Sequence, residues 1–183
     1  MIAVLVAAFV SAVAPTGRTL AVDPAASTIR FHIVHKLHGV DGTTNRIEGK
    51  AVVKEDGSVL AMVRVPVATF QSGDANRDEH MLEALEVGRH PFVVFKGVAR
   101  LGADVPPTGG PVIMQGEVDL HGVKREVAVP LSLEFGDDGT VRARGAFDTS
   151  LEAHAIKRPS LLFVKVDDNC RIDIDLVLRD EKQ

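Results

Sequence analysis

The chain has 183 residues, enough to bury one good hydrophobic core and too few for two, so we expect a single folded domain. Its formal net charge of −4 supplies no attraction for nucleic acid or for an anionic membrane surface. It contains eight phenylalanines but no tryptophan or tyrosine, the residues that most often stack on sugars and bases. Composition therefore argues against a nucleic-acid binder and against a carbohydrate binder.

The N-terminal segment, residues 1–19, is typical of a secretory signal. An apolar run from Ile2 to Val13 is too short to span a bilayer and is followed by the small-residue pattern Ala12-Val13-Ala14. No basic residue precedes the run, and Pro15 would hinder cleavage after Ala14, so a buried N-terminal strand or helix stays open as an alternative. We expect a folded domain over 20–183 in a periplasmic or secreted protein.

Strand-like alternation of apolar and polar residues then recurs along the chain, with turn residues between the segments. In 170–178, for example, Ile172, Ile174 and Leu176 alternate with charged residues. The predicted strands cover 27–36, 46–54, 58–67, 91–101, 111–120, 125–135, 139–149 and 170–178. The short turns favour antiparallel hairpins, so the pattern predicts an all-β fold, either a sandwich or a barrel.

One stretch, residues 71–97, departs from this alternation. Three N-cap residue types are followed by apolar residues at helical spacing and by Gly88, where a helix would end. The caps and the apolar stripe are Asp74, Asn76, Asp78, Met81, Leu82 and Leu85. So short a helix is marginal in water, so its stripe must dock on apolar surface. It would lie across the open end of a barrel or against the edge of a sandwich.

The histidines and the lone cysteine are the first candidates for chemistry. His32, His35 and His38 repeat every third residue, but positions 32 and 35 of a strand point to opposite faces, which argues against a shared metal ion. Cys170 has no partner for an internal disulfide and is better explained as a small buried hydrophobe than as a nucleophile.

The charged residues of the helical stretch give no assembled active site. Its carboxylates, on Asp78, Glu79, Glu83 and Glu86, are typical of a solvated face. Arg77 is more often a residue that ties down a loop than one that catalyses. No catalytic motif is present, so we expect no enzyme activity and no cofactor. The alternative is a metal-dependent or His/carboxylate enzyme built around His32, His35, His80 or His90.

Four segments of the chain, in order, are "AVDPAASTIRFHIVHKLHG", "GDANRDEHMLEALE", "HPFVVFKG" and "GEVDLHGVKREVAVPL". Together they resemble motifs of the YceI-like family, whose members are bacterial secreted proteins. The likeness runs from about Leu20 to Leu178. It implies a lipocalin-like antiparallel β-barrel of about eight strands with one short helix, which holds a polyisoprenoid or similar long-chain lipid. The chain departs from the family at Leu20, Glu86-Val87 and His90, where aromatic residues are usual, which bears on the identity of the ligand.

The ligand expected from this resemblance is an isoprenoid or another long-chain lipid such as a fatty acid, bound without covalent chemistry. Inward-facing apolar residues would line the lumen: Phe31, Ile33, Val65, Met81, Leu85, Phe95, Met114, Leu131, Leu133, Phe147, Ile172 and Ile174. For each of them plain core packing is the alternative, and a structural or stress protein with a filled barrel is the corresponding alternative function. A homodimer and a transient membrane contact stay open.

Overall fold

The structure is a computed structural model that describes residues 17–35, 38–102, 106, 108–158, 160–161 and 164–181; at residues 35, 38, 160–161 and 164–165 it describes the backbone only. Residues 1–16 of the predicted signal segment lie outside the described residues, and the first strand begins at Arg18, within the segment predicted to be a signal. No helix in the described ranges combines the length and the apolar character needed to cross a bilayer.

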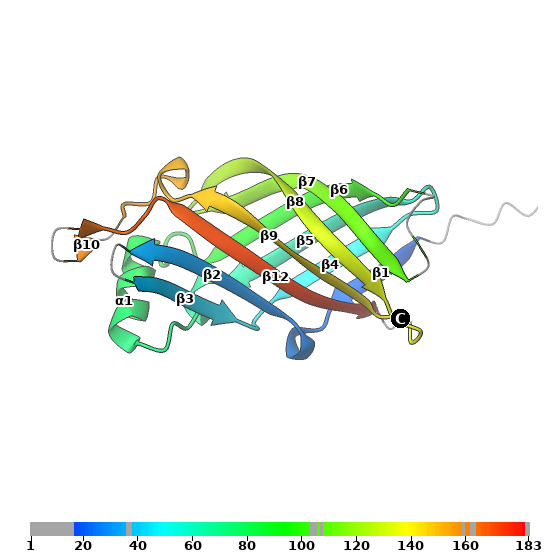
Figure 1. The fold of residues 1–183 in the computed structure, drawn as a ribbon, viewed down its shortest axis with the longest axis horizontal. Helices are drawn as coiled ribbons and strands as arrows, with labels where there is room; N and C mark the ends of the chain where they lie inside the picture. Colours follow the sequence, from blue (N-terminus) through cyan, green and yellow to red (C-terminus); the bar gives the residue numbers. More distant parts are fainter. Residues whose placement is uncertain are drawn as a thin grey trace, which may run out of the picture.

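Antiparallel strands make up most of the fold (Figure 1). Those of the main sheet are β1 (Arg18–Val22), β2 (Thr28–His35), β3 (His38–Thr44), β4 (Glu48–Val53), β5 (Ser58–Pro66), β6 (Phe92–Arg100), β7 (Gly109–Leu120), β8 (Val123–Phe135), β9 (Val141–Ser150) and β12 (Asn169–Asp180). A small hairpin joins β10 (Ser160–Leu161) to β11 (Val164–Lys165). The helices are α1 (Ala75–Ala84) and the 3₁₀ turns η1 (Pro24–Ala26), η2 (Val67–Thr69) and η3 (Glu152–His154).

The main sheet closes into an eight-stranded barrel. Its order is β1-β4-β5-β6-β7-β8-β9-β12, and β1 pairs with β12 to complete the ring. Every pairing is antiparallel, which the short hairpin turns of the sequence predict. The all-β barrel with a single described α-helix is therefore confirmed, and the sandwich is excluded.

The two extra strands lengthen the barrel wall. Val22 of β1 pairs with Leu178 and Thr28 of β2 pairs with Asp175, so β1 and β2 follow one another along β12. The turn η1 separates them, and the Ser27 hydroxyl in this bend accepts a hydrogen bond from Val177 N at 2.9 Å. Beside them, β3 and β4 follow one another in the same way. The wall is consequently longer at the end where β2 and β3 lie.

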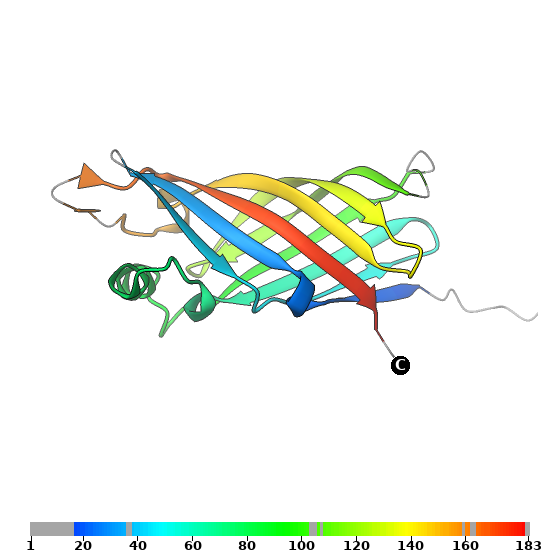
Figure 2. The ribbon, with the colours of Figure 1, turned by 60° about the horizontal axis from the view of Figure 1, so that its bottom comes forward.

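The segment between β5 and β6 is placed at this longer end, where Figures 1 and 2 show α1 beside β2 and β3. Thr43 and Gln71 form an isolated bridge with N–O distances of 2.9 and 3.0 Å, which fastens the segment to β3. The predicted N-cap is confirmed, because the Asp74 carboxylate accepts a hydrogen bond from Arg77 N at 3.1 Å. The predicted end at Gly88 is wrong: α1 ends at Ala84, and Glu86 takes a left-handed φ of 45°.

The eight predicted strands correspond to β2, β4 to β9 and β12, whereas β1 and β3 were not predicted. The glycines of β3 obscure its alternation and have a packing role. A Cβ atom on Gly42 would lie 2.2 Å from the ring of Phe31, its partner across the β2–β3 pair. Only glycine leaves the space that this aromatic ring occupies.

One group of buried side chains lies towards the β1 end of the barrel. They include Leu20, Val22, Val141, Leu176 and Leu178, each 8% exposed or less. A second and smaller cluster of Leu151, Ile156 and Cys170 contacts Leu85 and Leu120. We call the end of the barrel where α1 lies the mouth; β1 lies at the opposite end (Figure 1).

Candidate functional site

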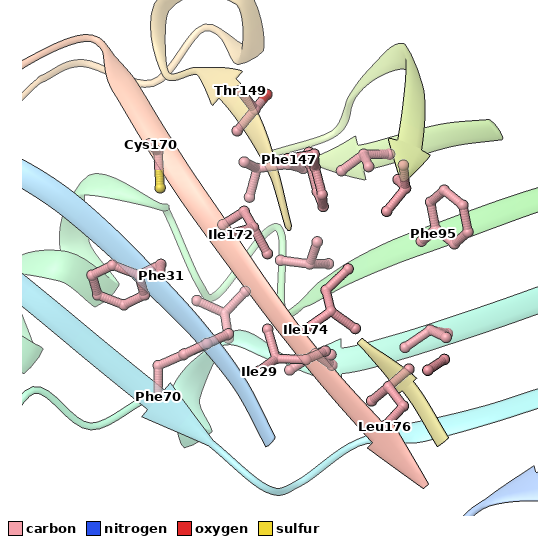
Figure 3. Close-up of a pocket in the computed structure, with 18 of the residues that line it drawn as sticks. Ile29, Phe31, Phe70, Phe95, Phe147, Thr149, Cys170, Ile172, Ile174 and Leu176 are labelled. Carbon is pink, nitrogen blue, oxygen red and sulfur yellow. The ribbon is translucent and has the colours of Figure 1, made fainter. Parts of the chain in front are cut away.

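The barrel encloses an apolar cavity of about 660 Å³. Its wall receives side chains from all eight barrel strands and from β2, β3 and α1. Figure 3 shows Phe31 and Ile29 of β2, Phe95 of β6 and Ile174 of β12 pointing into this common space. The volume lies within the range of about 300–1,000 Å³ that is usual for small-ligand sites. The side chains therefore do not fill the lumen.

All twelve residues predicted to line a lumen lie on the wall of this cavity: Phe31, Ile33, Val65, Met81, Leu85, Phe95, Met114, Leu131, Leu133, Phe147, Ile172 and Ile174. Ten of them lie on strands, where successive side chains point to opposite faces of the sheet and the inward phase places them there. Met81 lies on α1, and Leu85 is its C-cap residue. Their contact with a lipid stays a prediction.

Other wall residues were not predicted. Val63 and Val129 could have been found, because each lies two positions from a predicted wall residue on the same strand. Phe70 follows η2 and belongs to no alternating pattern. Its ring centroid lies 5.5 Å from that of Phe31, so the two rings form one aromatic contact on the wall near the mouth.

Polar side chains gather where α1 begins, on the boundary of the cavity. Ser72 N and Oγ both donate to Asp78 Oδ1, at 2.9 and 2.5 Å, and Arg77 Nε donates to Ser72 Oγ at 2.9 Å. Arg77 Nη2 also lies 4.0 Å from Asp74 Oδ2. Arg77 ties down the loop before the helix, as predicted, and it places a cation among the polar residues at the mouth of the cavity.

Cys170 lies on the cavity wall and is buried. Desolvation by burial, with a smaller contribution from the nearby Asp148 carboxylate, raises the pKa of its thiol to about 12. The thiol is therefore protonated at neutral pH, which agrees with the expectation of a buried hydrophobe rather than a nucleophile.

A shared metal site on His32, His35 and His38, against which the sequence argues, also finds no support in the described atoms. His32 Nδ1 pairs with the Asp41 carboxylate at 2.9 Å. His35 and His38 face each other in the β2–β3 register, and their side chains lie outside the described residues.

Two further histidines have contacts that the sequence did not reveal. His154 is fully buried; its Nδ1 donates to Val123 O at 2.8 Å and its Nε2 accepts from Thr149 Oγ1 at 3.0 Å. His121 lies with His90 and Glu86 in a cluster whose potential ligand atoms all lie within 4.8 Å of one another. Spacing in the sequence could not have found this cluster, because His121 lies in the β7–β8 hairpin and the other two lie in the turn after α1.

Comparisons with known proteins agree with this architecture. The family model described as the YceI-like domain matches residues 20–178. BcnA of Burkholderia cenocepacia has a TM-score of 0.72 at 18% identity, over 85% of this chain and 98% of that one. A polyisoprenoid-binding domain from Saccharophagus degradans, implicated in plant cell wall breakdown, has a TM-score of 0.72 at 13% identity, over 88% of this chain and 98% of that one.

A YceI protein of Campylobacter jejuni is also similar, with a TM-score of 0.52 at 13% identity over 98% of this chain and 91% of that one. A search of curated protein sequences finds no significant match. The structural likenesses, at such low identity, show a shared fold, and the family model matches most of the length of the chain. The chain belongs to the YceI-like family.

Proposed function

We propose that this protein binds and carries a long-chain apolar lipid, of the polyisoprenoid or fatty-acid-like class, inside the barrel and performs no covalent chemistry on it. The observation that carries the proposal is the apolar cavity of about 660 Å³, lined along its length by aliphatic and phenylalanine side chains. The structurally similar domain from Saccharophagus degradans is a polyisoprenoid-binding domain, which supports the same ligand class.

Burial of hydrocarbon supplies enough free energy for such binding. Each CH₂ group removed from water contributes about 0.8 kcal/mol, so a five-carbon isoprene unit contributes roughly 3–4 kcal/mol. Association costs on the order of 4–15 kcal/mol in lost freedom. Several buried units therefore outweigh the cost without a strong polar anchor, which favours a long-chain ligand over a short one.

The polar residues at the mouth favour one orientation of the ligand, with its tail inside the barrel and its head group beside α1. Arg77 uses Nε to hold Ser72, and its 4.0 Å separation from Asp74 is too long for a hydrogen bond. The guanidinium fork carries five N–H donors, so it can still donate to a carboxylate or a phosphate head group. Arg77 is thus the residue that we expect to contact an anionic head.

The place of action that we propose is the periplasm or the outside of the cell. The signal-like pattern of residues 1–19 is what supports it. Carriage of lipid between membranes would also require a transient membrane contact, which stays a prediction, as does a homodimer.

The experiment that tests the proposal is organic extraction of the purified protein followed by mass spectrometry. We expect a long-chain lipid in amounts comparable to the protein, and its loss from a variant whose lumen is blocked. Repeated preparations that contain no lipid, and that also fail to take up added polyisoprenoid or fatty acid, would favour the structural alternative instead.

A further inference from the structure

Three potential metal ligands from two distant segments meet beside the mouth. Glu86 and His90 lie in the turn that follows α1, and His121 lies in the hairpin between β7 and β8. The ring centroids of His90 and His121 are 4.8 Å apart, with the ring planes at 58°. One carboxylate and two imidazoles are ligand types that zinc and related ions accept.

The hydrogen bonding of His121 prepares one of its nitrogens for a metal ion. Its Nδ1 lies 3.1 Å from the carbonyl oxygen of His154, and because a carbonyl only accepts, Nδ1 must carry the proton. In the neutral ring Nε2 then presents a bare lone pair. Metal-binding histidines are oriented in this way, with the second ring nitrogen donating to a carbonyl or a carboxylate.

Nε2 of His121 is buried and has no hydrogen-bond partner among the described residues. An unpaired buried polar atom costs about 1–3 kcal/mol, so its presence calls for an explanation. A bound cation would supply the missing partner. The second nitrogen of His154, which is more deeply buried, is by contrast satisfied by Thr149.

The backbone around the cluster is unusual in a way that agrees with a site. Within the described ranges, the non-glycine residues with a left-handed φ are Glu86 at 45°, His121 at 56° and Ala155 at 56°. Two of these are the candidate ligands, and the third directly follows His154, whose carbonyl orients His121. Backbone strain of this kind concentrates at functional sites.

Glycine makes room for the third ligand. A Cβ atom on Gly122 would lie 2.6 Å from Cε1 of His90, so this glycine allows the ring of His90 to rest against the hairpin. His90 N also donates to Glu86 O at 3.0 Å, which places residues 86 and 90 on one side of the same turn. The Glu86 carboxylate pairs with Arg89 at 2.7 Å, but Arg89 is 76% exposed, and such surface pairs contribute little.

The geometry points to a site for one divalent transition-metal ion, of which Zn²⁺ is the best match, held by Glu86, His90 and His121. Ligand atoms of a tetrahedral zinc site lie about 3.4 Å apart, given metal–ligand distances of about 2.1 Å. The present spacing is up to 4.8 Å, so rotation of the Glu86 and His90 side chains would have to bring the ligand atoms closer on binding. The bound ion would fasten the end of α1 to the β7–β8 hairpin. This inference does not depend on the identity of the lipid.

The test uses the full chain without a histidine tag, stripped of metal and titrated with Zn²⁺ by isothermal calorimetry. The informative variant is His121→Asn, because the turn has positive φ at both central residues and Asn-Gly is the preferred pair there. His90→Asn is the second variant. His80→Asn is the matched control, since His80 is an exposed histidine of α1 outside the cluster.

We expect about one Zn²⁺ per chain, with affinity reduced at least ~10-fold in His121→Asn and in His90→Asn and unchanged in His80→Asn. Zn²⁺ should also raise the unfolding temperature of the wild type and of the control, but not that of His121→Asn. Mg²⁺ should give no such effect, because imidazole is a poor ligand for it. Equal affinities in all four proteins, or no Zn²⁺ binding to the wild type, would overturn the assignment.

Discussion

A larger side chain on the cavity wall should weaken lipid binding strongly without unfolding the barrel. Ala61 of β5 points into the cavity, and its partners across the neighbouring strands are Ala51 and Gly97. The ring of Phe95 covers Gly97, but Ala61 itself carries only a methyl group on the cavity wall, so a larger side chain at position 61 projects into the cavity. Ala61→Phe is therefore the substitution that we would make, with Ala128→Phe as its control on the exposed outer face of β8.

The expected loss follows from the hydrocarbon that the new ring displaces. The substitution adds a phenyl ring, which occupies the room of about six ligand carbons, each contributing about 0.8 kcal/mol when buried, so the upper bound is roughly 5 kcal/mol. Partial rearrangement of the ligand reduces this, and a loss of about 3 kcal/mol still corresponds to a more than 100-fold weaker dissociation constant. Ala128→Phe adds the same group outside the cavity and should leave binding unchanged.

The assay is equilibrium binding of a radiolabelled long-chain fatty acid or polyisoprenol to delipidated protein, with urea unfolding of each variant as the check on folding. Overpacking typically costs about 1–3 kcal/mol, and the cavity of about 660 Å³ next to position 61 should keep the cost at the lower end. If Ala61→Phe folds and still binds lipid as tightly as Ala128→Phe, the lumen is not the binding site.

Three further predictions concern the fold. A Cβ atom on Gly116 would lie 2.3 Å from a backbone oxygen of β6, so Gly116→Ala should lower the free energy of unfolding by about 1–3 kcal/mol. Gly88→Ala is the control, because a Cβ atom on Gly88 would have no neighbour within 4 Å, and it should leave the free energy of unfolding unchanged. Removal of the N-cap in Asp74→Ala should cost about 1 kcal/mol in urea unfolding, and Asp74→Asn should retain most of the stability. The hydrogen bonds from Arg142, at 2.7 and 2.6 Å, hold the pKa of the Asp175 carboxyl below its usual value of 3.8. A carboxyl whose pKa is lower in the folded than in the unfolded protein stabilises the fold above the unfolded pKa, and this contribution is lost as the pH falls through the folded pKa. Asp175→Asn should therefore lower the urea midpoint more at pH 7 than at pH 3. An equal loss at both pH values would contradict this.

The barrel strands were largely predictable from sequence because apolar and polar residues alternate along them. In β12, Ile172, Ile174 and Leu176 alternate with charged residues, which indicates which face of the strand is exposed to solvent. The structure places those three side chains on the cavity wall. Alternation alone, however, does not distinguish a sandwich from a barrel. The pairing of β1 with β12 that closes the ring joins residues near opposite ends of the chain, beyond the reach of any local pattern.

What the sequence did not predict depends on contacts between distant segments. The strand β3 has no apolar alternation because glycines stand at positions where rings on β2, such as that of Phe31, lie against its backbone. The cluster of Glu86, His90 and His121 forms only because the end of α1 and the β7–β8 hairpin meet at the mouth. The sequence places Glu86 among the carboxylates of a solvated face. Its left-handed backbone could not be predicted, because glycine is the usual residue in that conformation.

The most direct test of the lipid-carrier account is a crystal structure of the delipidated protein reloaded with a long-chain fatty acid that carries bromine at its methyl end. The account predicts an anomalous bromine peak inside the barrel, among the wall residues that lead towards Leu176 and Leu178, with the carboxylate near Arg77 at the mouth. Bromine found on the outer surface, or a lumen that collapses and stays empty at saturating ligand, would contradict it.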